Sequence, residues 1–391
     1  MSEIITYRLD EIADVIDCEH KTAPKVDSSD YYSIRTPDIK NGRLLYEQAN
    51  RVSAETYELW TKRGIPEAGD IILAREAPVG EVGWIDKDHK ICLGQRTVLI
   101  KIHSIEIDKK YLLYSFVSPK FKDYLNELSG GSVVAHLNMK DIRALEFSFP
   151  PLPEQKAIAS VLSSLDDKID LLHRQNKTLE AMAETLFRQW FIEEAKEDWN
   201  YVELGSVIET SSGGTPSRKV MSYYEDGSIY WVKSKELNGS FINHTEEMIT
   251  EEAVKKSSAK LLPAYSTLIA MYGATVGEYA LITKSMTCNQ AVCAVKENEL
   301  YPYTFIFMYV KHQKDELINQ AVGSAQQNIS QILIKKLPIP TCTDRIREYH
   351  SLVNPWFKRM QINVGQTQTL EQLRDILLPK LMNGEVKVKW G

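Results

Sequence analysis

The sequence predicts an α/β (α+β) protein in which two globular mixed α/β domains are separated by an antiparallel pair of long coiled-coil helices, with a pseudo-twofold internal repeat. Short motifs recur in the same order in both halves, each half holds short apolar stretches broken by turn residues, and each half ends in a heptad-spaced segment. This pattern divides the chain into a first globular domain, a first long helix, a second globular domain, and a second long helix with the C-terminal tail. The expected boundaries are 1–150, 151–197, 198–342 and 343–391.

The internal repeat rests on five matched segments. Their order is the same in both halves, and the offset between partners stays between 190 and 197 residues. Chance can supply one such match, but not five in register. The pairs are Ile71–Glu81 with Thr267–Glu278, Gly94–Gln95 with Asn289–Gln290, Gly131–Asn138 with Gly323–Ser330, Phe147–Pro150 with Leu337–Pro340, and Thr178–Glu180 with Thr369–Glu371.

Each globular domain is a segment of about 140 residues in which Gly, Pro, Asn and Asp separate short apolar runs, and this pattern is typical of strands and turns. Near the end of each domain we expect a helical stretch, over Lys109–Leu128 in the first copy and Tyr303–Val322 in the second. Glycine follows each stretch directly or within two residues, and glycine after the last periodic residue is a helix stop signal. A connector with prolines then leads into the long helix, at Pro150–Pro153 and at Pro338–Pro340.

The two long helices show apolar residues spaced alternately four and three apart, which is a coiled-coil seam. About 40 residues of helix at about 1.5 Å per residue make a rod of about 60 Å, longer than one domain needs for its own core. Each seam has a polar position near its centre that would fix register, or that reaches solvent where helices cross. The seams are Ile158, Leu162, Leu165, Ile169, Leu172, Asn176, Leu179, Ala183, Leu186 and Trp190, and Tyr349, Val353, Trp356, Met360, Asn363, Thr367, Leu370, Arg374, Leu377 and Leu381.

The composition is that of an ordinary globular protein, and it indicates where the protein is found in the cell and which ligands it can bind. No apolar run approaches the about 18 residues that span a bilayer, and the first ten residues show no secretory pattern, so we expect a cytoplasmic protein with no membrane contact. The five cysteines include no C-x-x-C pair, and we expect reduced thiols and no metal. The net charge of −6 does not favour binding to DNA phosphates, although residues 343–391 carry a net charge of +3.

Motifs for catalysis are missing from the sequence. No G-x-x-x-x-G-K-S/T loop is present to hold ATP phosphates. Asn354–Trp356 is the nearest approach to the N-P-P-Y-like motif that holds a flipped base, but it lacks the second proline and lies on the heptad seam. We therefore expect a non-enzymatic chain with no cofactor.

Several segments carry a resemblance to a known family. Pro150–Ala159 leads into Leu165–Ile169, and the second globular domain shows Ser212–Ser217, Ile229–Lys233, Gly273–Gly277 and Cys288–Val292. In this order, and repeated, the chain resembles the specificity subunits of type I restriction–modification enzymes over essentially its whole length. It departs from the pattern in two places. The first globular domain lacks the S-G-G-T-P string, and the second long helix lacks the P-L-P-E-Q start.

The resemblance implies a function for each part. Each globular domain would be a target-recognition domain that binds one half of a split double-stranded DNA target, and the helices would set the gap between the halves. Two modification (methyltransferase) subunits would dock on the helices and methylate adenine. Restriction subunits, which are ATP-dependent translocases and nucleases, would complete the complex.

Candidate DNA-contacting residues lie in or beside the repeated segments. Arg and Lys suit guanine, and Asn and Gln suit adenine, although each candidate can also be a solvated loop residue. Positions that both copies share, such as Val79-Gly80 and Val276-Gly277, more plausibly maintain the fold, because readers of different half-sites must differ where they touch bases. The candidates are Arg75, Gln95, Arg96, His136, Asn138 and Lys140 in the first copy, and Lys233, Ser234, Lys235, Tyr272, Gln326, Gln327 and Asn328 in the second.

Aromatic and apolar residues crowd the end of the first long helix at Leu186, Phe187, Trp190 and Phe191. Aromatic clusters are enriched at interfaces, so these four are candidate partner contacts, with packing inside the chain as the alternative. Two other functions stay open at this stage. One is a DNA methyltransferase or nuclease that acts alone, and the other is a coiled-coil protein with two ligand-binding heads and no dependence on DNA.

Overall fold

The computed structural model describes residues 4–76, 78–87, 89–128, 136–196, 198–322 and 328–389. The chain forms two compact units. Unit 1 comprises Met1–Lys168 with Leu370–Gly391, and unit 2 comprises Ile169–Thr369. This division cuts through both long helices and so differs from the predicted boundaries, which remain a prediction. The two units are described separately.

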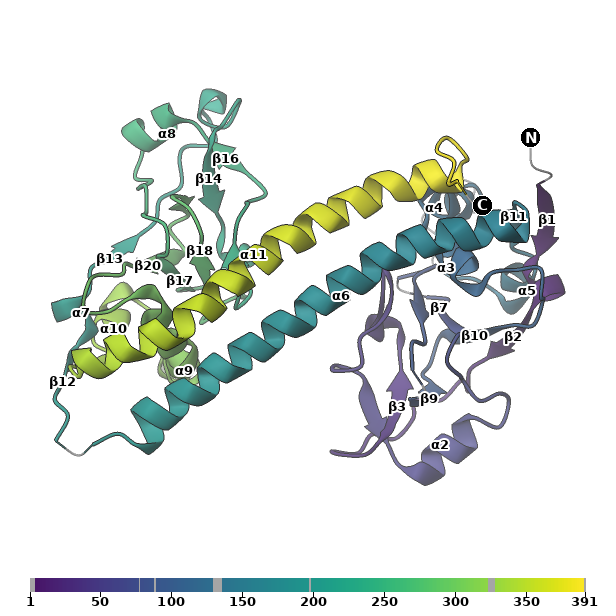
Figure 1. The fold of residues 1–391 in the computed structure, drawn as a ribbon, viewed down its shortest axis with the longest axis horizontal. Helices are drawn as coiled ribbons and strands as arrows, with labels where there is room; N and C mark the ends of the chain where they lie inside the picture. Colours follow the sequence, from purple (N-terminus) through teal and green to yellow (C-terminus); the bar gives the residue numbers. More distant parts are fainter. Residues whose placement is uncertain are drawn as a thin grey trace. The chain divides into compact units, whose positions relative to one another are not determined.

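Unit 1 is built on a six-stranded sheet in the order β2-β10-β7-β8-β5-β4, with a three-stranded sheet β6-β3-β9 and the pair β1-β11 (Figure 1). Its strands are β1 (Ile5–Arg8), β2 (Ala13–Asp17), β3 (Tyr31–Ile34), β4 (Ile39–Lys40), β5 (Gly42–Leu44), β6 (Asn50–Val52), β7 (Ile71–Ala74), β8 (Val82–Trp84), β9 (Lys90–Leu93), β10 (Thr97–Ile102) and β11 (Glu146–Phe149). Its shorter helices are α1 (Leu9–Ile12), α2 (Ala54–Trp60), α3 (Lys109–Val117), α4 (Pro119–Leu128) and α5 (Met139–Arg143), with a 3₁₀ turn at Thr36–Asp38.

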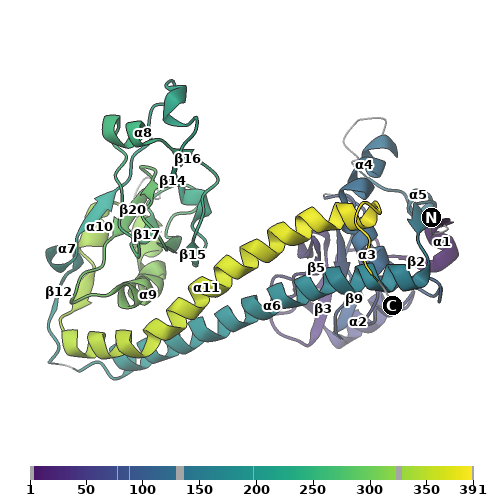
Figure 2. The same cartoon turned by 45° about the horizontal axis from the view of Figure 1, so that its top comes forward.

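Unit 2 contains a five-stranded sheet β13-β20-β17-β18-β15, a three-stranded sheet β16-β14-β19 and the pair β12-β21. In this unit β14, β16 and α8 lie together, away from α9 (Figures 1 and 2). The strands are β12 (Tyr201–Glu203), β13 (Thr210–Ser212), β14 (Ile229–Val232), β15 (Phe241–Ile242), β16 (Met248–Ile249), β17 (Thr267–Ala270), β18 (Tyr279–Ile282), β19 (Thr287–Cys288), β20 (Val292–Val295) and β21 (Pro338–Pro340). The shorter helices are α7 (Leu204–Val207), α8 (Glu251–Lys256), α9 (Tyr303–Val322) and α10 (Gln331–Lys335), with 3₁₀ turns at Met221–Tyr223 and Ser234–Glu236.

The backbone confirms the internal repeat. In unit 1 β10 pairs antiparallel with β7 and β2, and in unit 2 β20 pairs antiparallel with β17 and β13. Gly80 and Gly277 occupy matching turns, where each amide donates over 2.9 Å to the carbonyl of Ala74 or Ala270. Their φ angles are +83° and +81°, a region that favours glycine, so these shared positions serve the fold as expected.

One predicted helix is wrong in detail. The stretch Lys109–Leu128 is two helices, α3 and α4, that meet at Ser118 and Pro119. Ser118 is extended, with φ −64° and ψ 147°, because the ring of a following proline disfavours helical geometry at the preceding residue. The corresponding stretch in the second copy has no proline and forms the single helix α9.

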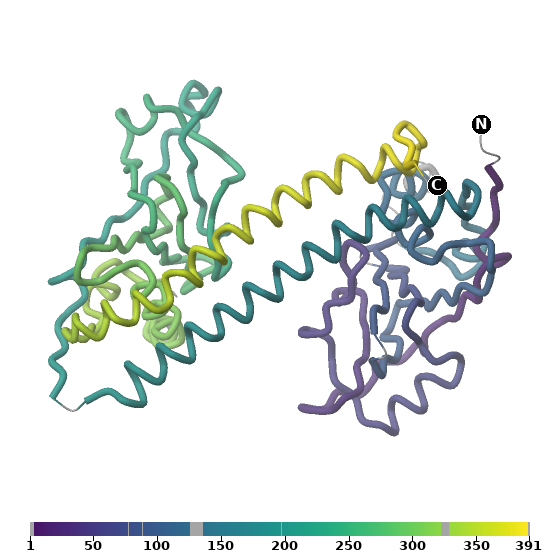
Figure 3. Tube along the Cα trace, in the orientation of Figure 1, coloured from purple at the N-terminus to yellow at the C-terminus, as the bar shows by residue number. Residues whose placement is uncertain are grey.

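The long helices are α6 (Leu152–Arg188) and α11 (Thr343–Met382), and a π-helical turn at Gln189–Glu193 follows α6. Within unit 2 they run antiparallel (Figure 3), since Tyr349 Oη donates over 2.9 Å to the Ala183 carbonyl while Asn363 meets Asn176 earlier on α6. The predicted seam of α11 is out of phase in two places. Phe357 and Leu378 are buried where Trp356 and Leu377 were expected, because a straight helix drifts relative to an exact heptad.

The polar seam positions form a direct pair. Asn363 is fully buried, and its Nδ2 donates over 2.8 Å to Oδ1 of Asn176. Asn176 Nδ2 in turn donates to the Met360 carbonyl at 3.3 Å. Asn363 Oδ1 accepts no hydrogen bond from the described residues, but the Asn363–Asn176 hydrogen bond can form in only one alignment of the helices, so it fixes their register within unit 2.

Both units use the long helices to complete their cores. The main core of unit 1 includes Leu162 of α6 and Leu381 of α11, and that of unit 2 includes Phe187 of α6 with Tyr349 and Phe357 of α11. Cys18, Cys92, Cys288 and Cys293 are buried free thiols, and burial raises the pKa of Cys92 to about 11 and that of Cys288 to about 12. No helix in the described ranges is long and apolar enough to cross a membrane.

Candidate nucleic-acid interface

Three of the six residues predicted in the first copy, Arg75, Arg96 and His136, meet at one edge of the unit 1 sheet. The backbone brings them there. Arg75, just after β7, donates its amide over 2.9 Å to the carbonyl of Arg96, which lies in the turn before β10. Leu137 donates its amide to the Arg75 carbonyl at 3.0 Å, and Glu76 forms a β-bridge with His136. Segments that are far apart in the sequence therefore present their side chains side by side.

These side chains form a continuous polar chain. Arg75 Nη1 lies 3.0 Å from Asp17 Oδ1, and Arg75 Nη2 lies 3.0 Å from His136 Nε2. Because a guanidinium only donates, His136 Nε2 accepts, and the imidazole proton belongs on Nδ1, which donates to Glu76 Oε1 at 2.8 Å. Glu76 Oε2 lies 2.7 Å from Nε of Arg96. We name Asp17, Arg75, His136, Glu76 and Arg96 the first-edge chain.

Members of the first-edge chain differ in how far they reach solvent. The Arg75 side chain is only 12% exposed and is held from both sides, so it positions its neighbours. The Arg96 side chain is 59% exposed. Its backbone has φ +67°, an uncommon conformation for a residue with a Cβ, and such outliers cluster at binding sites.

The other three residues predicted in the first copy play different parts. Gln95 is exposed but is held at both ends of its amide, since its Oε1 accepts from Thr22 Oγ1 and its Nε2 donates to the His20 carbonyl, both at 3.1 Å. Asn138 precedes α5 and donates over 3.0 Å to Asp141 Oδ2. Lys140 is exposed on α5.

A possible metal-ligand group also lies at this edge. Asp17, Cys18 and His20 bring their ligand atoms within 4.8 Å of one another. Asp17, however, is ion-paired with Arg75, and burial raises the pKa of the Cys18 thiol, which favours the protonated form over the thiolate that binds metals. The arrangement therefore fits a metal poorly.

The equivalent edge of unit 2 has the same backbone and different side chains. Met271 donates its amide to the Ala291 carbonyl at 2.8 Å and accepts from the Ile329 amide at 2.7 Å, as Arg75 does with Arg96 and Leu137. Predicted Tyr272 lies half-buried against the main core, and burial raises the pKa of its phenol. Asn328 is exposed, while predicted Gln326 and Gln327 lie outside the described residues.

Three hydrogen-bonded polar side chains at this second edge were not predicted from the sequence. Ser212 Oγ donates over 2.8 Å to Gln331 Oε1, and Gln331 Nε2 donates over 2.9 Å to Thr210 Oγ1. Thr215 Oγ1 also donates to Gln290 Oε1, which repeats the Thr22–Gln95 contact of unit 1. The match of Gln95 with Gln290 in the repeat was the available signal, and it marks a shared structural contact.

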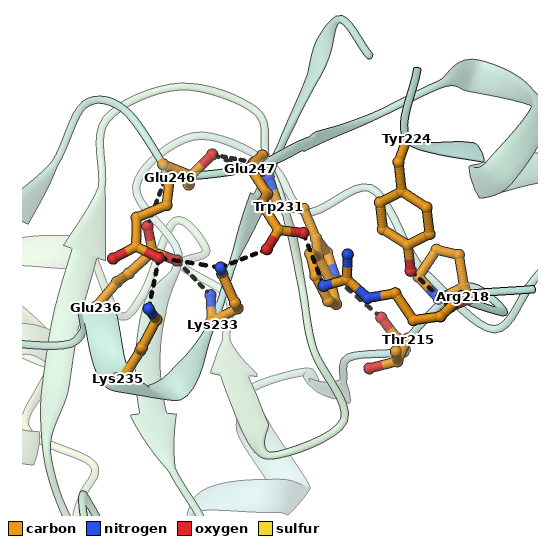
Figure 4. Close-up of polar contacts among 12 residues, drawn as sticks. Thr215, Arg218, Tyr224, Trp231, Lys233, Lys235, Glu236, Glu246 and Glu247 are labelled. Atoms are coloured by element: carbon orange, nitrogen blue, oxygen red, sulfur yellow. Dashed lines mark hydrogen bonds and ion pairs between the residues drawn. The ribbon is translucent and has the colours of Figure 1, made fainter. Parts of the chain in front are cut away.

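Lys233 and Lys235, two of the three predicted residues Lys233, Ser234 and Lys235, belong to a charged cluster beside β14 (Figure 4). Lys233 Nζ lies 2.8 Å from Glu247 and 3.0 Å from Glu246, and Lys235 Nζ lies 2.6 Å from Glu246. Burial acts to lower the pKa of Lys233, but hydrogen bonds to the two glutamates outweigh it, and the pKa is raised. Ser234 opens the 3₁₀ turn and is half-buried.

The position of Lys233 is structural in both copies. Its amide donates over 2.7 Å to Glu236 Oε2, just as the Arg35 amide donates over 2.9 Å to Asp38 Oδ2 in unit 1. A basic residue, a 3₁₀ turn and an acid three residues later therefore recur at the same place. Because the repeat preserves this arrangement and acids neutralise the Lys233 ammonium, Lys233 is a weak candidate for reading DNA.

Arg218, which was not predicted from the sequence, is a second accessible cation of this cluster beside Lys235, whose side chain is 60% exposed. The Arg218 side chain is 55% exposed and lies 2.7 Å from Glu247 Oε2. Its guanidinium sits over the rings of Tyr224, at 4.3 Å, and Trp231, at 5.2 Å (Figure 4). Trp231 Nε1 donates to the Gly214 carbonyl at 3.0 Å. A Cβ on Gly214 would lie 2.3 Å from the Ser258 backbone, so this glycine is required by close packing.

The predicted partner contacts divide into two kinds. Phe187 and Phe191 are only 3% and 4% exposed, and their rings pack against Phe305 and Tyr349. They belong to the core of unit 2 and offer no surface for docking, which corrects the expectation for these two. Leu186 and Trp190 are half-buried, and the Arg345 guanidinium covers the Trp190 ring at 3.6 Å.

Comparison with known proteins identifies the family. The family model described as "Type I restriction modification DNA specificity domain" matches residues 1–181 and again 196–343. The chain is 26% identical to the type I restriction enzyme MjaIX specificity subunit of Methanocaldococcus jannaschii, over 97% of this chain and 93% of that protein. It is 20% identical to the HindI specificity subunit of Haemophilus influenzae, over 90% of this chain and 94% of the relative.

A solved structure shares the fold. The crystal structure of a type I restriction–modification S subunit from M. genitalium superposes with a TM-score of 0.63 at 15% identity, covering 97% of this chain and 96% of the other. The fold and the two successive matches to one domain model agree with the repeat seen in the backbone. The chain therefore belongs to the family of type I restriction–modification DNA specificity domains, of which it carries two copies.

Proposed function

We propose that this chain is the sequence-specific DNA-binding subunit of a type I restriction–modification complex. The observation that carries the proposal is the pair of matches to one DNA specificity domain, with the same backbone arrangement at one sheet edge in each unit. Two copies of one reading domain suit a target in two parts. Different side chains on a shared backbone suit two half-sites of different sequence.

The proposed subunit is non-catalytic and acts through cytoplasmic partners. Two modification subunits dock on α6 and α11 and methylate adenine, and restriction subunits add ATP-dependent translocation and cleavage. The chain's own net charge of −6 is consistent with a reader that shares the work of neutralising phosphates with its partners. Within the predicted aromatic group, the half-buried Leu186 and Trp190 are the proposed partner contacts.

Proposed DNA contacts follow from accessibility. In unit 1 the first-edge chain presents Arg96, with Lys140 on the neighbouring helix α5. In unit 2 Asn328 and Tyr272 occupy the matching edge, Lys235 stays a candidate with a side chain that is 60% exposed, and Arg218 is an added candidate. Side chains that are bonded to other groups of this protein, such as Gln95 and Lys233, support these contacts.

The proposal is tested by mapping methylated adenines across the genome of cells that express this chain with an adenine methyltransferase subunit. We expect one motif in two specified parts separated by unspecified bases. Cells that express the methyltransferase alone are the control and should show no such motif. A single continuous motif, or no methylation with a competent partner, would refute the proposal. Methyl transfer or DNA cleavage by the purified chain alone would show an enzyme instead.

A further inference from the structure

We propose that Arg96 reads a guanine in the half-site bound by unit 1, and that the rest of the first-edge chain holds it in position. This inference rests on the proposed function. It names the base class that unit 1 recognises and the residue that recognises it.

Arg96 is the exposed end of the first-edge chain, and the other members of that chain are held in place by contacts with one another. Glu76 contacts Nε of Arg96 at 2.7 Å, and the terminal nitrogens of its guanidinium donate no hydrogen bond to any residue in the described ranges. A guanidinium that is held only through Nε keeps its outer edge, where each of the two terminal nitrogens offers one N–H, available to another acceptor. That pair of donors matches the O6 and N7 acceptors of guanine in the major groove.

The anchor itself is fixed by three further contacts. Glu76 is held by His136 at 2.8 Å, His136 by Arg75 at 3.0 Å, and Arg75 by Asp17 at 3.0 Å. Hydrogen bonds join Asp17, Arg75, His136 and Glu76 in sequence, so the carboxylate of Glu76 cannot turn away without breaking the His136 contact. A guanidinium whose orientation is fixed before binding loses less entropy when it binds a base.

Charge distinguishes a base contact from a phosphate contact here. The two arginines of the first-edge chain are balanced by Asp17 and Glu76, and the hydrogen bonds assign a neutral His136. A cluster with no net charge is a poor phosphate clamp, because phosphate affinity depends on uncompensated positive charge. A base edge presents dipolar acceptors, to which a compensated but directed arginine still donates.

Unit 2 shows that Arg96 is a variable position on a shared backbone. Ala291 replaces Arg96, Met271 replaces Arg75 and Tyr272 replaces Glu76, as the matched hydrogen bonds place them. Unit 2 therefore lacks the arginine and its anchor at this edge. The guanine contact belongs to one half-site only.

The experiment measures binding of the complex of this chain with its methyltransferase subunits to the mapped target and to a panel of duplexes, each with one base pair changed. The chains compared are wild type, Arg96→Ala, Arg96→Lys and Arg8→Ala. Arg8 is the matched control, since it is also an exposed, acid-paired arginine of unit 1 (51% against 59%) but is the last residue of β1, outside the first-edge chain. Retained selectivity for the second half-site reports that each variant is folded and assembled.

We expect Arg96→Ala and Arg96→Lys to reduce the preference for one G·C pair, in one half-site, by about tenfold or more, and Arg8→Ala to change nothing. Lysine keeps the positive charge but lacks the two parallel N–H donors of the guanidinium, so Arg96→Lys should not restore the preference for the G·C pair. Loss of affinity for all duplexes alike, or rescue by lysine, would indicate a phosphate contact and overturn the inference. A bipartite wild-type target whose preferences survive Arg96→Ala would also overturn it while leaving the proposed function intact. A wild-type complex with no bipartite target would refute both.

Discussion

Removal of the Asp166 carboxylate tests how the globular part of unit 1 is fastened to the long helices. Asp166, on α6, accepts from Tyr114 Oη of α3 at 2.7 Å and from Arg374 Nη1 of α11 at 3.1 Å. Arg43 Nη2, on β5, lies 3.5 Å away. One carboxylate thus joins four elements of unit 1, and Asp166→Ala removes all three contacts together.

The expected cost follows from burial. Tyr114 is 4% exposed, and a buried hydrogen bond to a charged acceptor contributes about 1.5–3 kcal/mol. The ion pair with Arg374, in which the two side chains are 22% and 20% exposed, adds about 1 kcal/mol or less. The better helix propensity of alanine offsets about 0.5 kcal/mol. We therefore expect Asp166→Ala to lower the free energy of unfolding of unit 1 by about 2–3 kcal/mol.

Urea unfolding, with hydrogen exchange of the α3 amides to locate the effect, measures this loss. The matched control is Asp167→Ala, which removes an exposed carboxylate from the next position of the same helix and should change stability by less than about 0.5 kcal/mol. Burial first, and then the charge of Asp166, raise the pKa of Tyr114, so the same substitution should lower that pKa. Equal stability of the two variants, with unchanged exchange in α3, would refute the reasoning.

Three further substitutions test unit 2. Asn363→Ala should lower the free energy of unfolding by about 1–2 kcal/mol, because it leaves Oδ1 of Asn176 without its donor in the seam. Replacing both asparagines by leucine should recover that loss, and a double-mutant cycle with no coupling would contradict this. Lys311→Met should cost about 1 kcal/mol at pH 8. Burial acts to lower the pKa of Lys311, but hydrogen bonds to Glu180 and Glu184 outweigh it, and the pKa is raised. The contribution of Lys311 to the free energy of unfolding should therefore be complete below the ordinary lysine pKa and should fade as the pH rises through the raised value. A stability difference from wild type that does not change with pH would argue against the ion pairs. Phe187→Ala should cost about 3–5 kcal/mol in denaturant unfolding, while Leu171→Ala, at a side chain 39% exposed, should cost far less; similar losses would contradict the core assignment.

Periodicity and repeats were sufficient to predict most of the fold. Heptad spacing predicted both long helices because a long apolar stripe has few alternatives, and the duplicated motifs predicted two domains with one topology. The phase of the α11 seam was beyond such reasoning, since Phe357 and Trp356 are adjacent and equally apolar, and only packing decides which is buried. The break at Pro119 was visible in the sequence, and its effect on Ser118 follows from local sterics.

The candidate site was harder to predict, because the sequence does not state which charges neutralise each other. Arg96 and Arg75 look alike in sequence, but tertiary contacts leave one exposed and bury the other. Glu246 and Glu247, which engage Lys233, gave no signal, since surface acids are common. The repeat was the best guide available. Shared positions such as Gly80 and Gly277 serve the backbone, and it is the differing positions that supply candidate readers.

In the proposed function, two copies of one reading domain, joined by helices of fixed length, recognise a split target. The most direct test of this proposal is to insert one helical turn, four residues or about 6 Å, into both α6 and α11 and to map the methylated motif again. We expect both half-sites to be unchanged and the gap between them to grow by about two base pairs, at about 3.4 Å each. An unchanged gap in a variant that still methylates both half-sites would contradict the proposal.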